Sequence, residues 1–194
     1  MIGESMGLLR SALCAALAGE EDVEVVAEVT GLGELPGMVR RHLPDVVLVD
    51  LASGAPEPVK VITETAPATA VLALCDRWGR GLVEEALTAG AKGLIGKDEP
   101  LHELVRAVRA LAAGERVIDV AAAATALRPA TGPLTPREAE VLRMAAEGLP
   151  LKEIARRLFL AHGTVRNHLS AIMRKTGARN RMEAVLLARR DGWM

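Results

Sequence analysis

Apolar residues in the first two-thirds of the chain follow two alternating patterns. Short runs that are apolar almost throughout are typical of buried strands, and stretches with apolar residues every three or four positions are typical of amphipathic helices. The strand-like runs occupy residues 23–29, 45–51, 70–75 and 93–96, and the helix-like stretches occupy residues 8–18, 35–43, 59–65, 81–91 and 101–113. Buried strands that alternate with helices predict a parallel sheet covered by helices on both faces.

The last third of the chain shows only helical spacing. Its first helix has a recognisable start, because Thr135 can cap it, Pro136 fits the first turn, and Glu138 stands three residues after the cap. At this spacing the Thr and Glu side chains can bond the free backbone amides reciprocally. An all-helical domain is therefore expected at the C-terminal end.

A loop is expected between the two patterns. Residues 128–133 hold two prolines and a glycine, which are typical of a connecting segment, and the Ala-rich residues 117–127 before them are compatible with a short helix. We expect a first domain over residues 1–116, a linker over residues 117–133 and a second domain over residues 134–194.

The charged side chains are distributed unevenly between these parts. Residues 1–127 hold 11 basic and 19 acidic side chains, a net charge of −8, whereas residues 128–194 hold 13 and 6, a net charge of +7. The basic part indicates either a polyanionic partner or a merely solvated surface. The chain has two Trp, one Phe and no Tyr, so it lacks the aromatic platforms on which single-stranded nucleic acids stack, and double-stranded DNA is the more plausible partner.

Several other classes of protein fit the sequence poorly. No apolar run reaches the ~18 residues of a membrane span, and the N-terminal residues lack the pattern of a secretory signal. Cys14 and Cys75 provide neither a disulfide framework nor zinc-ligand spacing. We expect a cytoplasmic protein with no membrane partner.

Two short helical segments near the C-terminus predict a helix-turn-helix. Residues 151–158 form the first, and after a brief turn residues 163–176 form a second, amphipathic helix. A helix pair of this kind can insert its second helix into the major groove, although a bundle with polar outer faces is an alternative. Side chains on the outer face of the second helix are Arg166, Asn167, Ser170 and Arg174, and those placed to hold phosphates are Lys152, Thr164, Lys175 and Arg179. Arg can read guanine and Asn can read adenine, whereas phosphate contacts fix only the register.

The string LTPREAEVLRMAAEGLPLKEIARRLFLAHGTVRNHLSAIMRKTGARNRMEAV closely resembles the LuxR-type helix-turn-helix of NarL/FixJ-family regulators. The resemblance implies DNA-contacting positions at Thr164, Arg166, Asn167 and Ser170. It also implies a last helix, following Arg179, that pairs DNA-bound subunits. One position departs from the family: Ala161 stands where a Ser usually caps the recognition helix, and such a loss typically costs about 1 kcal/mol.

The first domain resembles the receiver domain of response regulators, a flavodoxin-like α/β fold with five parallel strands. The resemblance is carried by Asp50 at the end of an apolar strand, by the ALTAGAKG segment, and by Lys97 with Asp98. It implies that Asp50 accepts a phosphoryl group from a sensor histidine kinase, that Mg²⁺ held by adjacent acids neutralises the transferring oxygens, and that Lys97 pairs with the phosphate.

Several positions of that phosphorylation switch are altered. Glu4 keeps one member of the usual acidic pair, but Ser5 stands where the second, metal-contacting acid is expected. Cys75 occupies the Ser/Thr switch position and is a poor hydrogen-bond donor, and Leu94 occupies the aromatic switch position. We therefore expect Glu4 and Asp50 to bind Mg²⁺ weakly or not at all, and Asp50 to be a weak or vestigial phosphoacceptor.

The first strand of this receiver-like domain is unusually short. Only residues 1–3 precede Glu4, although this strand is normally central in the sheet. Either the protein starts upstream of Met1 or the sheet tolerates a two- to three-residue strand.

These features predict a DNA-binding response regulator that acts as a dimer on operator DNA, with residues 101–113 as one candidate pairing surface. An alternative is a phosphorylation-independent regulator gated by a small ligand or a protein partner near Glu4, Asp50 and Lys97. An enzyme on the same fold is a poorer match, because no nucleophile–base pair, Gly-rich phosphate loop or metal triad is visible. Cys75 is the only candidate nucleophile.

Overall fold

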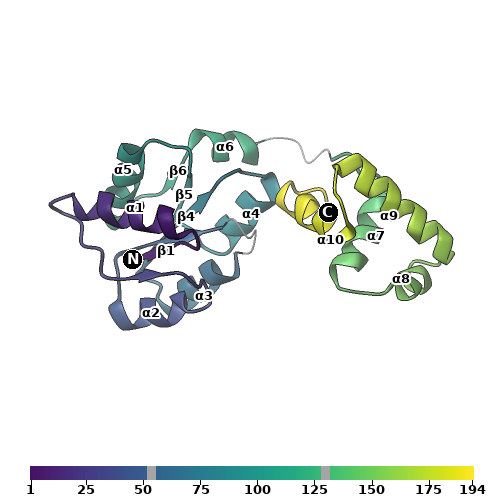
Figure 1. Ribbon diagram of the computed structural model, residues 1–194, viewed down its shortest axis with the longest axis horizontal. Helices are drawn as coiled ribbons and strands as arrows, with labels where there is room; N and C mark the ends of the chain where they lie inside the picture. Colours follow the sequence, from purple (N-terminus) through teal and green to yellow (C-terminus); the bar gives the residue numbers. More distant parts are fainter. Residues whose placement is uncertain (52–55, 128–131) are drawn as a thin grey trace. The chain divides into compact units, whose positions relative to one another are not determined.

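The computed structural model describes residues 1–51, 56–127 and 132–194, which form two compact units. The first unit is built on a parallel sheet of six strands in the order β2-β1-β3-β4-β5-β6 (Figure 1). The strands are β1 (Ile2–Gly3), β2 (Glu28–Val29), β3 (Val46–Asp50), β4 (Ala70–Cys75), β5 (Gly93–Gly96) and β6 (Val117–Ile118).

Helices cover this sheet on both faces. They are α1 (Gly7–Ala18), α2 (Leu35–His42), α3 (Glu57–Thr65), α4 (Arg80–Thr88), α5 (Leu101–Ala112) and α6 (Val120–Ala126). Helices α1 and α5 pack on one face, where Leu13 and Leu104 join Leu48, Leu72 and Ile95 of the strands in a single buried cluster. Helices α2 and α3 lie on the other side of the sheet (Figure 1). Because both faces are covered, β3 is buried throughout, as the continuous apolar pattern predicts.

The short first strand is paired on both sides. Ile2 is in register with Glu28 of β2 and with Leu48 of β3. The terminal ammonium of Met1 donates to the carbonyl of Val46 at 3.0 Å. This pairing places Glu4 at the end of a central strand.

The expectation of a five-stranded sheet was wrong by one strand. Residues 117–127, which the sequence pattern assigns to a linker, instead carry β6 and α6. Val117 pairs in parallel with Gly93 because the outer edge of β5 is otherwise open to hydrogen bonding. The expected strand over residues 23–29 is also shorter, since only Glu28 and Val29 pair with the two-residue β1. The remaining linker residues, 128–131, lie outside the described residues.

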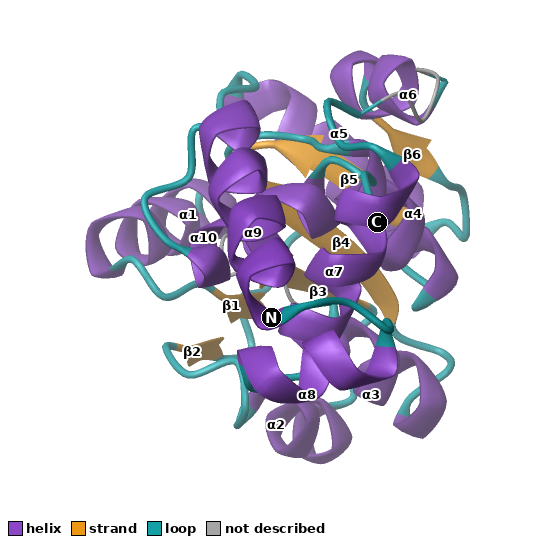
Figure 2. Cartoon of the chain, turned by 90° about the vertical axis from the view of Figure 1, so that its right-hand side faces the viewer, coloured by secondary structure: helices purple, strands orange, loops and turns teal. Residues whose placement is uncertain are grey.

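Residues 132–194, which together with residues 79–82 make up the described part of the second unit, hold helices as their only regular elements. These helices are α7 (Pro136–Ala146), α8 (Leu151–Arg157), α9 (His162–Thr176) and α10 (Arg181–Arg190), coloured purple in Figure 2. Helix α7 begins with the expected reciprocal capping box between Thr135 and Glu138. One buried cluster joins the four helices, with Leu142, Ile154, Ile172 and Val185 at its centre. Across the described ranges, no helix is long and apolar enough to cross a membrane.

Candidate acidic site and nucleic-acid interface

Three charged side chains meet at the carboxyl-terminal edge of the sheet. Glu4 follows β1, Asp50 ends β3 and Lys97 follows β5. Parallel strands bring these ends to one edge, and Lys97 Nζ lies 2.8 Å from both Glu4 Oε2 and Asp50 Oδ1. Glu4 is fully buried, Asp50 is 2% exposed, and the Lys97 side chain is 7% exposed. The ammonium thus bridges two buried carboxylates.

The electrostatics of this triad favour a charged lysine. Burial lowers the pKa of Lys97, but its hydrogen bonds to Asp50 and Glu4 and their charges outweigh burial and raise the pKa above its ordinary value. Glu4 Oε1 also accepts from the Met6 amide at 2.8 Å, and the Glu4 carbonyl accepts from Arg10 at 2.9 Å. The acids and the base therefore hold one another in a fixed arrangement with one surplus negative charge.

This arrangement is a poor fit for Mg²⁺. Ser5, which replaces an acid, is neutral and donates from Oγ to Asp50 Oδ2 at 3.1 Å. A dication would compete with the Lys97 ammonium for the oxygens of Glu4 and Asp50. Within residues 1–51, 56–127 and 132–194, no three acidic, His or Cys side chains are grouped as a metal site.

The two residues expected at the switch positions, Cys75 and Leu94, are both buried. Cys75 ends β4 and is 5% exposed, with Sγ donating to the Arg77 carbonyl at 3.1 Å and accepting from the Arg77 amide at 3.4 Å. Burial raises the pKa of the Cys75 thiol, which disfavours the reactive thiolate. Leu94 on β5 is fully buried. Leu94 is therefore part of the core of the first unit.

Asp119 is a polar residue of this region that sequence reasoning missed. Its Oδ2 accepts from the Gly96 amide at 2.6 Å and from Trp78 Nε1 at 3.0 Å, and its Oδ1 accepts from the Ala122 amide at 2.5 Å. One carboxylate therefore joins the strand end next to Lys97, the loop after β4 and the start of α6. An Asp before an Ala-rich stretch signals a helix cap, but nothing local signals the other two contacts.

The expected reading face is exposed on α9. Val165, Leu169 and Ile172 face the core of the helical unit, as their spacing predicts. The opposite face presents four exposed side chains, namely Arg166, Asn167, Ser170 and Arg174. No hydrogen bond or ion pair ties these four side chains to any other residue in the described part of the chain. Their polar ends are therefore available to an external partner.

The residues expected to hold phosphates differ in their exposure and in their contacts within the chain. Lys152 is exposed on α8, and Thr164 is half-buried in the first turn of α9. Arg179 is exposed but is bonded to Glu183 at 3.2 Å. Lys175 Nζ lies 2.6 and 2.9 Å from the oxygens of the buried Glu138, so it also ties α9 to α7. This structural role of Lys175 was not foreseen, because its partner is 37 residues away.

The recognition helix starts without a side-chain cap. Ala161 has extended backbone angles at the cap position, and no side chain bonds the first amides of α9. The preceding turn is held instead by Arg137, whose Nη2 donates to the Leu158 carbonyl at 2.5 Å. The start of α9 therefore leaves amides that a DNA phosphate can satisfy.

Known proteins resemble both units. Residues 132–188 match the family described as "Bacterial regulatory proteins, luxR family". The transcriptional regulatory protein DesR of Bacillus subtilis is 33% identical over 193 residues, which cover 99% of this chain and 96% of DesR. The response regulator RamR of Streptomyces coelicolor is 44% identical over 113 residues, or 58% of this chain and 56% of RamR.

Solved structures show the same fold. The response regulator ChrA of a heme-sensing two-component system has 27% identity and a TM-score of 0.57, with 100% of this chain and 97% of ChrA covered. RcsB from Salmonella enterica serovar Typhimurium bound to the promoter rprA has 22% identity and a TM-score of 0.67, with 97% and 96% covered.

A receiver-type α/β unit followed by a helix-turn-helix unit defines the class of DNA-binding response regulators. The chain belongs to the NarL/FixJ family of transcriptional regulatory proteins with a LuxR-type helix-turn-helix. DesR of Bacillus subtilis and UhpA of Escherichia coli are both described as transcriptional regulatory proteins.

Proposed function

We propose that this regulator binds double-stranded operator DNA as a homodimer and that its receiver responds to a signal other than ordinary Mg²⁺-dependent phosphorylation. The single observation that carries the DNA-binding proposal is the row of polar side chains on α9 that have no partner among the described residues. An α-helix fits the major groove of B-DNA, where Arg and Asn discriminate bases by bidentate hydrogen bonds.

Charge and similarity support the same target. Residues 128–194 carry a net charge of +7, which favours a phosphate backbone. RcsB is described as bound to DNA as dimers, and a two-fold protein matches a two-fold operator. We extend this arrangement to the present chain as part of the proposal, with Lys152, Thr164, Lys175 and Arg179 on the phosphates.

The weak role assigned to Asp50 follows from the triad. Its carboxylate is paired with Lys97, and the neighbouring Ser5 supplies no charge for a metal. Cys75 bonds its own loop and is a poor donor to a phosphate. Asp50 is therefore a weak or vestigial phosphoacceptor in this proposal, and a sensor histidine kinase is a partner only if Asp50 is labelled.

A second candidate input is a small ligand or a protein partner that acts on the receiver without phosphorylation. A specific feature favours the ligand, since an apolar cavity of about 290 Å³ adjoins Lys97.

The test begins with selection of operators from a random pool of DNA duplexes. Operator affinity is then measured for the wild type, Asp50→Ala and Asp50→Glu, each with and without acetyl phosphate and Mg²⁺. Equal affinities under all conditions are expected. Rapid, Mg²⁺-dependent labelling of Asp50 together with tighter DNA binding would contradict the proposal for the receiver, and failure to enrich any duplex would contradict sequence-specific binding.

A further inference from the structure

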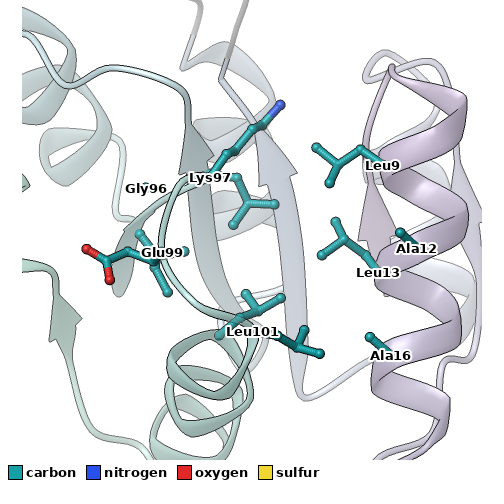
Figure 3. Close-up of a pocket in the computed structure, with 11 residues that line it drawn as sticks. Leu9, Ala12, Leu13, Ala16, Gly96, Lys97, Glu99 and Leu101 are labelled. Carbon is teal, nitrogen blue, oxygen red and sulfur yellow. The ribbon is translucent and has the colours of Figure 1, made fainter.

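An apolar cavity lies between α1 and α5, next to the acidic site. Its volume is about 290 Å³. It is lined by Leu9, Ala12, Leu13 and Ala16 of α1, by Leu74 of β4, by Ile95, Gly96 and Lys97 at the end of β5, and by Glu99, Leu101 and Leu104. Figure 3 shows Leu9 and Leu13 projecting from α1 toward the strand that ends at Lys97.

The sequence of α1 explains why this space is not filled. Ala12 and Ala16 stand one turn apart and face the cavity with a single methyl group each, where larger side chains would reach α5. The floor is deep and apolar, because Leu13, Leu74, Ile95 and Leu104 are 8%, 3%, 3% and 6% exposed. The rim is open, since Ala12 is exposed and Leu101 is 48% exposed.

The lining offers no charge to a ligand. Lys97 lines the cavity with its stem, while its Nζ is held by Glu4 and Asp50. The carboxylate of Glu99 points away from α1 (Figure 3). A buried charged or strongly polar ligand would therefore lose its hydration without finding a partner.

The cavity size limits the ligand further. A dry apolar cavity of about 150 Å³ holds a benzene molecule, so about 290 Å³ corresponds to roughly two fused rings. The concave floor of four buried side chains favours such a molecule over a flat contact with a second copy of the chain. We propose that this cavity is the binding site for a neutral, apolar molecule of about two rings, and that this molecule is an input signal of the regulator.

The position of the cavity gives the ligand access to the receiver site. Gly96 and Lys97 belong to its lining, so a ligand in the cavity lies beside the lysine that bridges Glu4 and Asp50. Gly96 is also bonded through its amide to Asp119, which caps α6. The proposal rests on the ligand-gated candidate described above.

Naphthalene serves as the probe, and 2-naphthoate, which adds a carboxylate to the same rings, serves as its charged counterpart. Each is titrated into the full-length protein with side-chain methyl resonances recorded by NMR. We expect saturable shifts from naphthalene at Leu9, Leu13, Ile95 and Leu104, and weaker binding of 2-naphthoate, because its carboxylate must stay in water at the open rim and keeps the rings from entering the apolar floor as deeply.

Ala16→Leu fills the cavity and is expected to weaken naphthalene binding by at least about tenfold, since the added side chain takes the ligand's space. Ala15→Leu adds the same atoms to an exposed position of α1 outside the cavity, and should bind like the wild type. Ala12→Leu, at the exposed rim, replaces Ala16→Leu if the latter fails to fold.

The proposal would be overturned if the naphthalene shifts did not saturate, or if Ala16→Leu bound naphthalene as tightly as the wild type. It would also be overturned if sedimentation showed that Ala16→Leu has a different oligomeric state, because the groove would then be an interface between copies of the chain. The input role is tested by adding naphthalene to the operator complex, where an unchanged affinity would refute it. The binding titration contains no DNA, so its failure leaves the DNA-binding proposal intact.

Discussion

Two lysines in this protein act as bridges to buried carboxylates. Lys97 holds Glu4 and Asp50 in the first unit, and Lys175 holds Glu138 in the second. The Lys175 side chain keeps 32% of its surface exposed, so it can stabilise the fold from the same helix that presents the proposed base-reading residues. Arg166 and Asn167, in contrast, make no bond within the described ranges, which is the usual state of side chains reserved for a partner.

Arg166→Ala is expected to relax the base preference of the regulator. The lost bidentate contact should reduce discrimination at one operator position by about 1–3 kcal/mol, measured by competition between operator duplexes that differ at single base pairs. Lys152→Ala is the control, because a lost phosphate contact weakens binding to all sequences alike. It should also lower the slope of log affinity against log salt concentration by about one. Unchanged base preference in Arg166→Ala would place the reading face elsewhere.

The Glu138–Lys175 pair should make the second unit sensitive to acid. Burial raises the pKa of Glu138, but hydrogen bonds from Lys175 and Thr135 outweigh it and hold the pKa below the ordinary value of 4.5. A carboxyl whose pKa is lower in the folded state contributes stability that is present above pH 4.5 and is lost as the pH falls through the folded pKa. Chemical denaturation monitored from pH 6 to 3 should show this loss.

Glu138→Gln is the matched variant for that experiment. It removes the titrating group while keeping the side-chain shape, so it should be less stable than the wild type at pH 6 and should lose less stability on acidification. Parallel pH curves for the two proteins would show that Glu138 is not the titrating group responsible.

Helices and strands differ in how far the sequence predicts them. The start of α7 follows from neighbouring residues, since Thr135, Pro136 and Glu138 supply cap, turn and capping box within four positions. Strand β6 cannot be predicted from neighbouring residues. Its Val-Ile pair becomes a strand only through pairing with Gly93 and Leu94, which lie 24 positions earlier. Local patterns therefore predict the helical unit well, whereas the edges of the sheet depend on distant partners.

Ala161→Ser should stabilise α9. The hydroxyl would accept a hydrogen bond from an amide in the first turn that no side chain now satisfies, with an expected gain of about 1 kcal/mol in the free energy of unfolding. Ala171→Ser, within the same helix, is the control and should give no gain, because Ser in a helix interior competes with the backbone. If both variants proved equally stable, the first turn of α9 would already be satisfied in another way.

The whole molecule combines a predictable scaffold with a site assembled over long distances. Resemblance to receivers places Asp50 and Lys97 correctly at one sheet edge, and the residues at positions 4 and 5 complete the group. The bridging geometry of Lys97 was not predictable, because it depends on three strand ends separated by more than 40 residues each. The contacts of Asp119 to Gly96 and Trp78 are equally non-local.

The charge at position 5 is expected to decide whether the receiver site accepts Mg²⁺. Ser5→Asp would add a second surplus negative charge beside Asp50 at an exposed position, so Mg²⁺ could compete with Lys97 for the carboxylates. Isothermal titration with MgCl₂ should then show saturable binding by Ser5→Asp and little by the wild type. Ser5→Asn introduces a side chain of nearly the same shape as Asp but without its charge, and should bind Mg²⁺ as little as the wild type does. Wild-type binding as tight as that of Ser5→Asp would mean that the neutral Ser5 does not limit metal binding, and the argument for a weak phosphoacceptor would lose its electrostatic basis.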